Sequence, residues 1–230
     1  MVLGSGLVAR GFKVYVDDDN YLVFASGVSN SANRDAKAFS RERTLLEDAT
    51  KVHNGKTFIY FSTCSIYDPS LKHSQYVKHK LEMEAIIQRH VANYHIFRIS
   101  NLVGNTDNPH TVLNFFVQHI RTGHSFKVWK NAARNIVDID DAFAICDHII
   151  RKKLFLNTWV NIANTRNYPV MQIIRAIEQV IGKQGNYKLV DAGDNPMIDT
   201  SSIEEIVHTL DISFDDHYLT KTLRKYYSQQ

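Results

Sequence analysis

A threonine, a tyrosine and a lysine in residues 60–84 have the types and spacing for acid–base chemistry at a carbonyl group. Thr63 follows a short apolar run, Tyr76 comes thirteen residues later, and Lys80 follows Tyr76 by four. Residues i and i+4 share one face of a helix, so Lys80 can lie beneath Tyr76. A nearby ammonium lowers the pKa of a tyrosine from its usual value near 10, which suits Tyr76 as a general acid or base. Thr63 could hydrogen-bond the same substrate oxygen.

The same pattern also has a purely structural interpretation. A YxxxK match is expected about once by chance in a chain rich in Tyr and Lys, although Tyr76–Lys80 is the only match among the eleven tyrosines. Periodicity alone favours a surface Tyr–Lys pair beside an unremarkable threonine. Other segments of the chain must decide between the two interpretations.

The segment "VLGSGLVARGF" contains a second candidate site, for a nucleotide. Gly4, Gly6 and Ala9 match G-x-G-x-x-A directly after a short strand and at the start of a helix. Such a turn lets the backbone approach a diphosphate at the helix N-terminus, so we expect Gly4, Ser5, Gly6 and Leu7 to contact a dinucleotide. Glycine-rich turns between a strand and a helix also occur without any ligand.

One expected part of a dinucleotide site is missing. An acidic residue about 20 positions on usually holds the adenosine ribose, but Asp17, Asp18 and Asp19 come only 11 to 13 residues after Gly6. We expect Lys13–Val16 to be either a remnant of a second strand or one arm of a hairpin with residues 21–25. A solvated turn is the favoured interpretation of the three aspartates.

Short apolar runs alternate with helical periods along the chain. The predicted strands are residues 1–3, 21–25, 57–61, 94–98 and 159–163, and the predicted helices 35–52, 74–91, 111–122 and 169–182. In the first of these helices, Phe39, Leu45, Leu46 and Ala49 are predicted to face inward. The pattern is typical of a parallel sheet covered on both faces, a doubly wound α/β fold. Ligands bind such sheets at the carboxyl ends of the strands, where the polar clusters at 4–6, 25–27, 62–65 and 99–101 fall.

The composition excludes several classes of protein. A net charge of +3 with scattered basic residues does not indicate a nucleic-acid partner. The two cysteines, Cys64 and Cys146, cannot form a disulfide framework or a zinc site, and the histidines lack ligand spacing, so no metal is expected. No apolar run approaches the roughly 18 residues that span a bilayer, and no signal peptide is recognisable. We expect a cytoplasmic protein without a membrane partner.

Several segments, in order, resemble the extended short-chain dehydrogenase/reductase family, in particular its nucleotide-sugar epimerases, dehydratases and ketoreductases. The segment "FASGVSNS" (24–31) is similar to the family's fourth strand, "FSTCSIYD" (61–68) to its "SSxxVYG" strand, and "YVKHK" (76–80) to its YxxxK motif. The segments "FRISNLVG" (97–104), "ARNIVDIDDA" (133–142) and 160–182 resemble later family motifs. The ordered matches overturn the surface-pair interpretation of Tyr76 and Lys80.

The resemblance implies roles for individual residues. It implies NAD or NADP as the cofactor, with Thr63, Tyr76 and Lys80 catalytic and Lys80 also holding the nicotinamide ribose. The further cofactor contacts that it implies are Ala25, Ser26, Gly27, Tyr76, Ile99 and Ser100. The implied substrate contacts are Ser65, Asn101 and Arg134, the last at the nucleotide diphosphate.

The chain also departs from the family pattern. The second and third strands are expected to be absent, so the predicted fold is a truncated Rossmann-like sheet with a small C-terminal substrate lobe. The loop between Thr63 and Tyr76 is about ten residues shorter than in typical members, which should reshape the sugar pocket. Cys64 and Ser65 replace the Asp–Glu pair of the 4,6-dehydratases, which disfavours dehydration, and Cys64 is expected to be a packed thiol.

The expected organisation is a dinucleotide-binding core at 1–104 and a lobe at 105–230, into which a core strand and helix return at about 159–182. The predicted activity is epimerisation or keto reduction of a nucleotide-sugar in polysaccharide or glycoconjugate precursor synthesis. A binding protein without turnover is the alternative, motivated by the missing adenosine strands. A homodimer whose neighbour completes the site is a third hypothesis.

Overall fold

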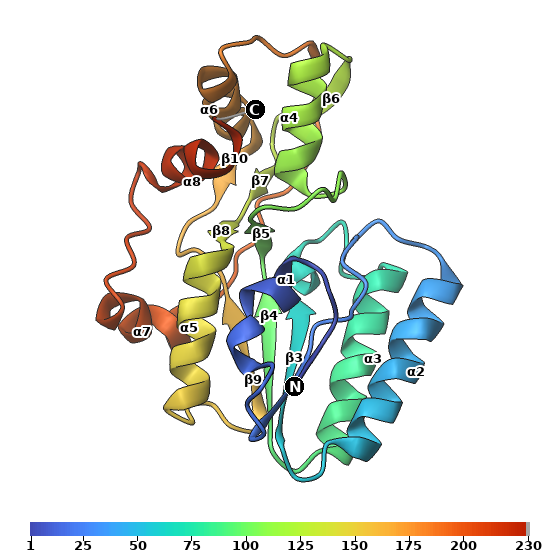
Figure 1. The fold of residues 1–230 in the computed structure, drawn as a ribbon. Coiled ribbons are helices and arrows are strands. Elements are labelled where there is room, and N and C mark those ends of the chain that lie inside the picture. Colours follow the sequence, from blue (N-terminus) through green and yellow to red (C-terminus); the bar gives the residue numbers. More distant parts are fainter. Residues whose placement is uncertain (229–230) are drawn as a thin grey trace.

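The computed structural model describes residues 1–228, which form a core and a C-terminal lobe (Figure 1). The helices are α1 (Leu7–Gly11), α2 (Ala36–Val52), α3 (Gln75–His90), α4 (Val112–Thr122), α5 (Ile139–Arg151), α6 (Val170–Ile181), α7 (Glu204–Thr209) and α8 (Tyr218–Tyr227). The strands are β1 (Val2–Leu3), β2 (Tyr21–Phe24), β3 (Thr57–Thr63), β4 (Tyr94–Ile99), β5 (Asn101–Val103), β6 (Phe126–Trp129), β7 (Ala133–Arg134), β8 (Ile136–Asp138), β9 (Thr158–Ile162), β10 (Tyr168–Pro169) and β11 (Tyr187–Val190). Three 3₁₀ helices occur at Lys13–Tyr15, Cys64–Tyr67 and Ser201–Ile203.

The core is a five-stranded parallel sheet in the order β1-β2-β3-β4-β9, as the alternating pattern predicted. Successive residues of a strand point to opposite faces. Phe58 and Tyr60 therefore pack with Met83 and Ile87 of α3, whereas Ile59 belongs to the cluster that includes α5. Helices α2 and α3 cover one face, and α1 and α5 the other (Figure 1). The predicted doubly wound α/β fold is confirmed.

The N-terminal region differs from both sequence-based expectations for Lys13–Val16. Residues Lys13–Tyr15 form a 3₁₀ helix, neither a strand remnant nor one arm of a hairpin. The side chain of Tyr15 is buried, and its hydroxyl donates to Asp147 of α5 at 2.6 Å. Tyr15 thus anchors this turn to α5. Strand β1 pairs with β2 and lies at the edge of the sheet.

The lobe is built from α4, α6 and α8 with three pairs of short strands, β6–β11, β7–β10 and β5–β8. Strand β9 joins the core sheet beside β4, but α6, which we expected to return to the core with it, packs against α4 and α8 in the lobe. Its apolar face supplies Ile173, Ile174 and Ile177 to the lobe interior. Within residues 1–228, no helix is long and apolar enough to cross a membrane.

The buried imidazole of His95 makes the fold sensitive to acid. His95 lies on β4, and burial lowers its pKa to about 4, with a hydrogen bond to the backbone of Phe155 opposing that shift. Between pH 6.5 and 4 the unfolded chain therefore binds a proton that the folded chain does not. We expect wild-type stability to fall by about 2 kcal/mol from pH 7 to pH 5 through this group.

Replacing His95 with Asn should remove this loss, which urea unfolding at the two pH values would measure. The exposed His73 offers a matched control, because His73→Gln should leave the pH dependence of the wild type in place. An equal fall in the stability of His95→Asn and the wild type would contradict the assignment.

Candidate active site

A cavity of about 830 Å³ opens at the carboxyl ends of the core strands and continues to the lobe. Its walls include Ser5, Gly6, Leu7, Ala25, Ser26, Gly27, Thr63, Ser65, Tyr76, Lys80, Ile99, Ser100, Asn101 and Arg134. These are all the predicted site residues except Gly4. Segments that lie far apart in the sequence therefore meet at one edge of the sheet, as the parallel topology requires.

Gly4 lies behind the cavity wall and permits the tight turn. Its φ is +133°, and a Cβ at this position would lie 2.4 Å from the carbonyl oxygen of Ala25. A Cβ on Gly6 would instead meet no atom within 4 Å. Since Gly6 lines the cavity, the turn leaves free space where a bound group can approach the backbone.

Thr63 and Tyr76 are held by the structure of the loop between them. Thr63 ends β3, and its side-chain oxygen accepts the N–H of Ser65 at 3.0 Å to cap the following 3₁₀ helix. This bond does not use the hydroxyl proton of Thr63, which can be donated to a bound oxygen. Ser74 caps α3, so that Tyr76 lies in its first turn and packs against Val28.

Lys80 lies one turn beyond Tyr76 and is almost wholly buried. Its ammonium donates to Glu42 Oε1 at 2.9 Å, to the hydroxyl of Tyr60 at 3.2 Å and to the backbone oxygen of Phe61 at 3.4 Å. A Cβ on Gly27 would lie only 2.5 Å from Nζ, so the absence of a side chain there leaves room for the ammonium.

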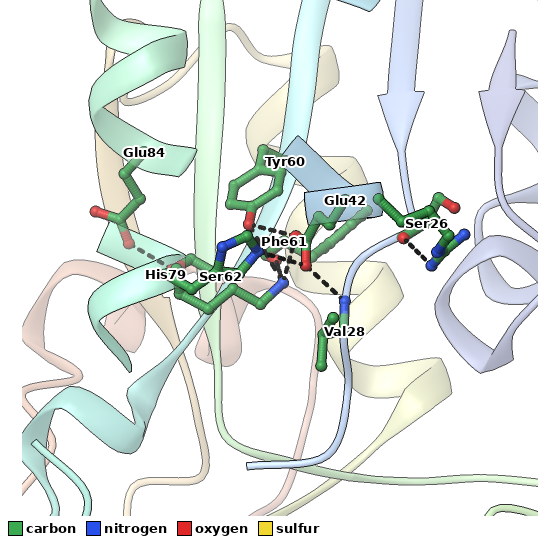
Figure 2. A network of polar contacts seen from close by, with 10 residues as sticks. Ser26, Val28, Glu42, Tyr60, Phe61, Ser62, His79 and Glu84 are labelled. Carbon is green, nitrogen blue, oxygen red and sulfur yellow. Dashed lines mark hydrogen bonds and ion pairs between the residues drawn. The ribbon is translucent and has the colours of Figure 1, made fainter. Parts of the chain in front are cut away.

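Glu42, on α2, is a buried carboxylate that the sequence analysis missed (Figure 2). Its second oxygen, Oε2, accepts the N–H of Val28 at 2.6 Å and lies 3.0 Å from Nε2 of His79. Burial opposes ionisation, but Lys80, His79 and the N–H of Val28 together lower the pKa of Glu42 to about 2. Its position four residues before the buried Leu46 was a signal that it faces inward.

The inward face of α2 also differs from the prediction at Leu45. That side chain is 40% exposed, whereas Leu46 and Ala49 are buried as expected. Leu45 and Leu46 are adjacent, so they lie about 100° apart around the helix axis, and the buried stripe passes through Glu42, Leu46 and Ala49.

Ser100 lies where the resemblance implied contact with a nicotinamide. Its hydroxyl oxygen is buried and has no hydrogen-bond partner among residues 1–228. Buried hydroxyls are normally hydrogen-bonded, so an unpaired one facing a cavity fits a polar group of a bound molecule. Together with the open space at Gly6, this makes the residues present a reasonable fit for a dinucleotide.

The predicted substrate residues lie on the lobe side of the cavity. Asn101, on β5, donates its side-chain N–H to the backbone oxygen of Asn135 at 2.8 Å. Arg134, on β7, donates to the backbone oxygen of Ala133 at 2.8 Å, which leaves further donors of the guanidinium for an anionic ligand. Asn101 thus contributes an amide and Arg134 a cation to the site.

Other candidates from the sequence are not at the site or are inert. Asp19 is exposed and pairs with Lys56 at 2.8 Å, and the lining residues include none of the three aspartates at 17–19. Cys64 borders the cavity, but its thiol donates to the backbone oxygen of Arg98 and burial raises its pKa far above the usual range. In residues 1–228, no group of three or more His, Cys, Asp or Glu side chains is placed to hold a metal ion.

Solved structures resemble the whole fold. A UDP-glucuronic acid 4-epimerase variant from Bacillus cereus, bound to NAD and a substrate analogue, has 18% identity and a TM-score of 0.69, with 90% of this chain and 74% of that chain covered. A dTDP-glucose 4,6-dehydratase from Bacillus anthracis with NAD has 15% identity and a TM-score of 0.69. The match covers 95% of this chain and 75% of that chain. RMD from Pseudomonas aeruginosa with NADPH has 14% identity and a TM-score of 0.71. The match covers 97% of this chain and 96% of that chain.

At such low identity these structures establish the fold alone, and a search of curated proteins found no match. The family model is more specific. Residues 21–163, from strand β2 to the end of β9, match the model described as the NAD dependent epimerase/dehydratase family. The match includes Thr63, Tyr76 and Lys80 and covers more than half of the chain. The chain therefore belongs to the NAD dependent epimerase/dehydratase family.

Proposed function

We propose that this protein is an NAD(P)-dependent enzyme that epimerises a nucleotide-activated sugar or reduces a keto-sugar. The observation that carries the proposal is the meeting of Thr63, Tyr76 and Lys80 with the glycine turn at one cavity. Membership of a family described as NAD dependent supports the cofactor. The substrates of the similar structures, UDP- and dTDP-sugars, support the substrate class.

In the proposed mechanism the chain binds, orients and moves a proton. The nicotinamide, when bound, supplies or accepts a hydride at the reacting sugar carbon. Tyr76 gives its phenolic proton to the oxygen on that carbon during reduction, or takes it during oxidation. Thr63 donates a hydrogen bond to the same oxygen, and Lys80, one turn beyond Tyr76 on α3, brings a positive charge to the same cavity.

Residues of the glycine turn, of the loop after β2 and of the end of β4 would hold the dinucleotide. Gly6 and Leu7 would face its diphosphate, Ala25 to Gly27 its middle, and Ile99 and Ser100 the nicotinamide end. Ser65, Asn101 and Arg134 would hold the nucleotide-sugar, with Arg134 opposite its diphosphate.

Epimerase and reductase differ in what becomes of the cofactor. An epimerase returns the hydride to the same sugar and keeps its cofactor, so denatured protein should release stoichiometric NAD(P). A reductase consumes NAD(P)H steadily with a keto-sugar. Assaying the released nucleotide and the absorbance at the NAD(P)H band would separate the two reactions.

Replacing Gly6 with Val is expected to weaken binding of NAD(H) or NADP(H) by roughly 100-fold, equivalent to losing one or two hydrogen bonds to a charged oxygen. The valine side chain would fill the free space at the turn, while the φ of −73° at this position is acceptable to any residue. Calorimetry on the two proteins would measure the change.

Gly6→Ala offers a graded control with a smaller loss, and an unchanged unfolding midpoint would show that the fold is intact. If wild-type protein failed to bind either dinucleotide at millimolar concentration, the proposed enzyme would be contradicted. The chain would then be a binding protein derived from the family. The edge position of β1, with no further strand paired beside it in residues 1–228, also favours this alternative. Cytoplasmic location and pairing into a homodimer stay predictions of the sequence.

A further inference from the structure

Asp68 is the only carboxylate among the residues of 1–228 that line the active-site cavity. The cations in the same lining are Arg41, Lys80 and Arg134. The sequence motifs implied a role for Thr63 but none for Asp68, the last residue of the same segment. The residue is only 7% exposed. Because a buried carboxylate is costly unless it is hydrogen-bonded, its contacts indicate what it does.

The backbone of Asp68 is held on both sides. Asp68 ends the 3₁₀ helix Cys64–Tyr67, and its N–H donates to the backbone oxygen of Ser65 at 3.2 Å. Its own backbone oxygen accepts the N–H of Leu71 at 2.9 Å and that of Lys72 at 2.8 Å. The side chain therefore starts from a fixed point in the cavity wall, which reduces the entropy lost when a ligand binds.

Only one of the two carboxylate oxygens of Asp68 is used within the protein. Oδ1 accepts the N–H of Ser70 at 2.9 Å and its hydroxyl at 2.6 Å. Oδ2 accepts no hydrogen bond from residues 1–228, and it is not enclosed, since the buried polar atoms without a partner there are Nδ1 of His95 and the hydroxyl oxygen of Ser100. Because Asp68 lines the cavity, Oδ2 is an acceptor open to a molecule bound there.

Asp68 and Thr63 lie at the two ends of one 3₁₀ helix. Thr63 caps its start, and Asp68 follows its last residue, Tyr67. Five residues of 3₁₀ helix rise about 10 Å, so the two side chains contact different parts of a bound molecule. In the proposed mechanism Thr63 bonds the reacting oxygen. Asp68 then meets a part of the ligand away from the reacting carbon.

The chemistry of a carboxylate restricts what that part can be. Oδ2 attracts O–H donors and repels the oxygens of phosphates and of other carboxylates. In the proposed arrangement, the diphosphate of the dinucleotide faces the glycine turn and that of the nucleotide-sugar faces Arg134. The sugar ring remains for Asp68, and its hydroxyl groups are donors.

We propose that Asp68 determines specificity by accepting a hydrogen bond from a hydroxyl of the sugar ring, so that the site takes nucleotide-activated neutral hexoses and rejects the corresponding uronic acids. This inference rests on the proposed function and narrows its substrate class. A negative charge on a ring that touches Asp68 lies within a few ångströms of Oδ2, where repulsion costs about tenfold or more in affinity. A purely structural role of Asp68 in its loop would affect stability and not the choice of sugar.

The test compares sugars that differ only at C6, which is an alcohol in one and a carboxylate in the other. UDP-glucose with UDP-glucuronic acid, and GDP-mannose with GDP-mannuronic acid, form two such pairs on different bases. Calorimetry on protein mixed with NADH or NADPH gives each Kd. For at least one base, we expect the wild type to bind the neutral sugar about tenfold or more tightly than the acid. In Asp68→Asn the ratio should fall to about one, because the repulsion is lost and the amide can donate to the acid.

Two comparisons separate this effect from damage to the loop and from the general field of the protein. Asparagine keeps an oxygen that can accept from Ser70, so the unfolding midpoint should stay close to that of the wild type. Asp107 is exposed and lies between two lining residues without being one itself. Asp107→Asn removes the same charge and should keep the wild-type ratio. If Asp68→Asn does not fold, Asp68→Ser replaces it, and if neither folds, the preference of the wild type alone decides.

Several results would overturn the inference. A wild type that binds the acid as tightly as the neutral sugar would do so, as would an unchanged ratio in Asp68→Asn or an equal change in Asp107→Asn. Binding of NADH or NADPH with none of the four sugars would also overturn it, while the dinucleotide half of the proposed function would stand. If the wild type bound neither a dinucleotide nor a sugar, the proposed function itself would be contradicted, and this inference would fall with it.

Discussion

Replacing Tyr76 with Phe is expected to lower turnover by about 10²–10⁴-fold while leaving the binding of dinucleotide and nucleotide-sugar nearly unchanged. The phenol of Tyr76 lies in the first turn of α3, in the wall of the cavity that Thr63 also lines. Phenylalanine keeps the packing against Val28 and removes only the oxygen. Steady-state rates with UDP- and dTDP-sugars, and Kd values from calorimetry, would separate the two effects.

A tyrosine outside the cavity provides the control for this prediction. Tyr187 lies on β11 in the lobe and packs on the ring of Phe126. Tyr187→Phe removes the same atom away from the site, so its rate should match that of the wild type. Retention of more than half of the activity by Tyr76→Phe would rule out the acid–base role. If the wild type, Tyr76→Phe and Tyr187→Phe all bound the ligands equally and none turned them over, the binding-protein alternative would be favoured.

Replacing Glu84 with Ala is expected to cost about 3–5 kcal/mol of stability, because it leaves a buried guanidinium without its partner. Glu84 accepts from Arg98 at 3.0 and 2.6 Å and from the hydroxyl of Ser62. Both charged side chains are nearly buried, and the guanidinium also stacks 4.0 Å from the ring centre of Trp159. The pair joins α3 to the end of β4 directly behind the cavity.

Urea unfolding of purified protein would measure this cost. Glu82 gives a matched control, since it lies on the same helix and also pairs with an arginine, Arg43, but is about half exposed. Exposed pairs contribute only about 0–1 kcal/mol, so Glu82→Ala should unfold almost like the wild type. A loss below about 1 kcal/mol for Glu84→Ala would show that water reaches Arg98 in the folded protein.

The order of elements was predictable because each strand of the core is short, apolar and followed by a polar cluster. Burial on both faces produces that pattern directly, and Phe58 to Phe61 shows it well, with alternate side chains in two different clusters. The carboxyl ends of parallel strands then had to meet, which brought Thr63 next to Ser100 and the glycine turn.

The residues that sequence reasoning missed depend on contacts between distant segments. Glu42 looks like one of several charges on a surface helix, and only the packing of α2 on α3 and β3 buries it. Lys13–Tyr15 has a strand-like composition, but Tyr15 is held in a 3₁₀ turn by Asp147, more than a hundred residues later. The local propensity of a segment for strand or helix contains no information about a hydrogen-bond partner so distant in the sequence.

The two buried cysteines can be used to measure opening motions of the folded protein. Cys64 lies in the wall of the cavity and Cys146 in the interior of α5, and burial raises the pKa of both. A thiol reagent can modify them only in molecules that have opened, so the rate of alkylation measures an opening free energy. Modification of Cys64 follows local opening of the cavity wall, whereas modification of Cys146 requires α5 to leave the sheet. The ratio of the two rates distinguishes breathing of the pocket from global unfolding in the native chain.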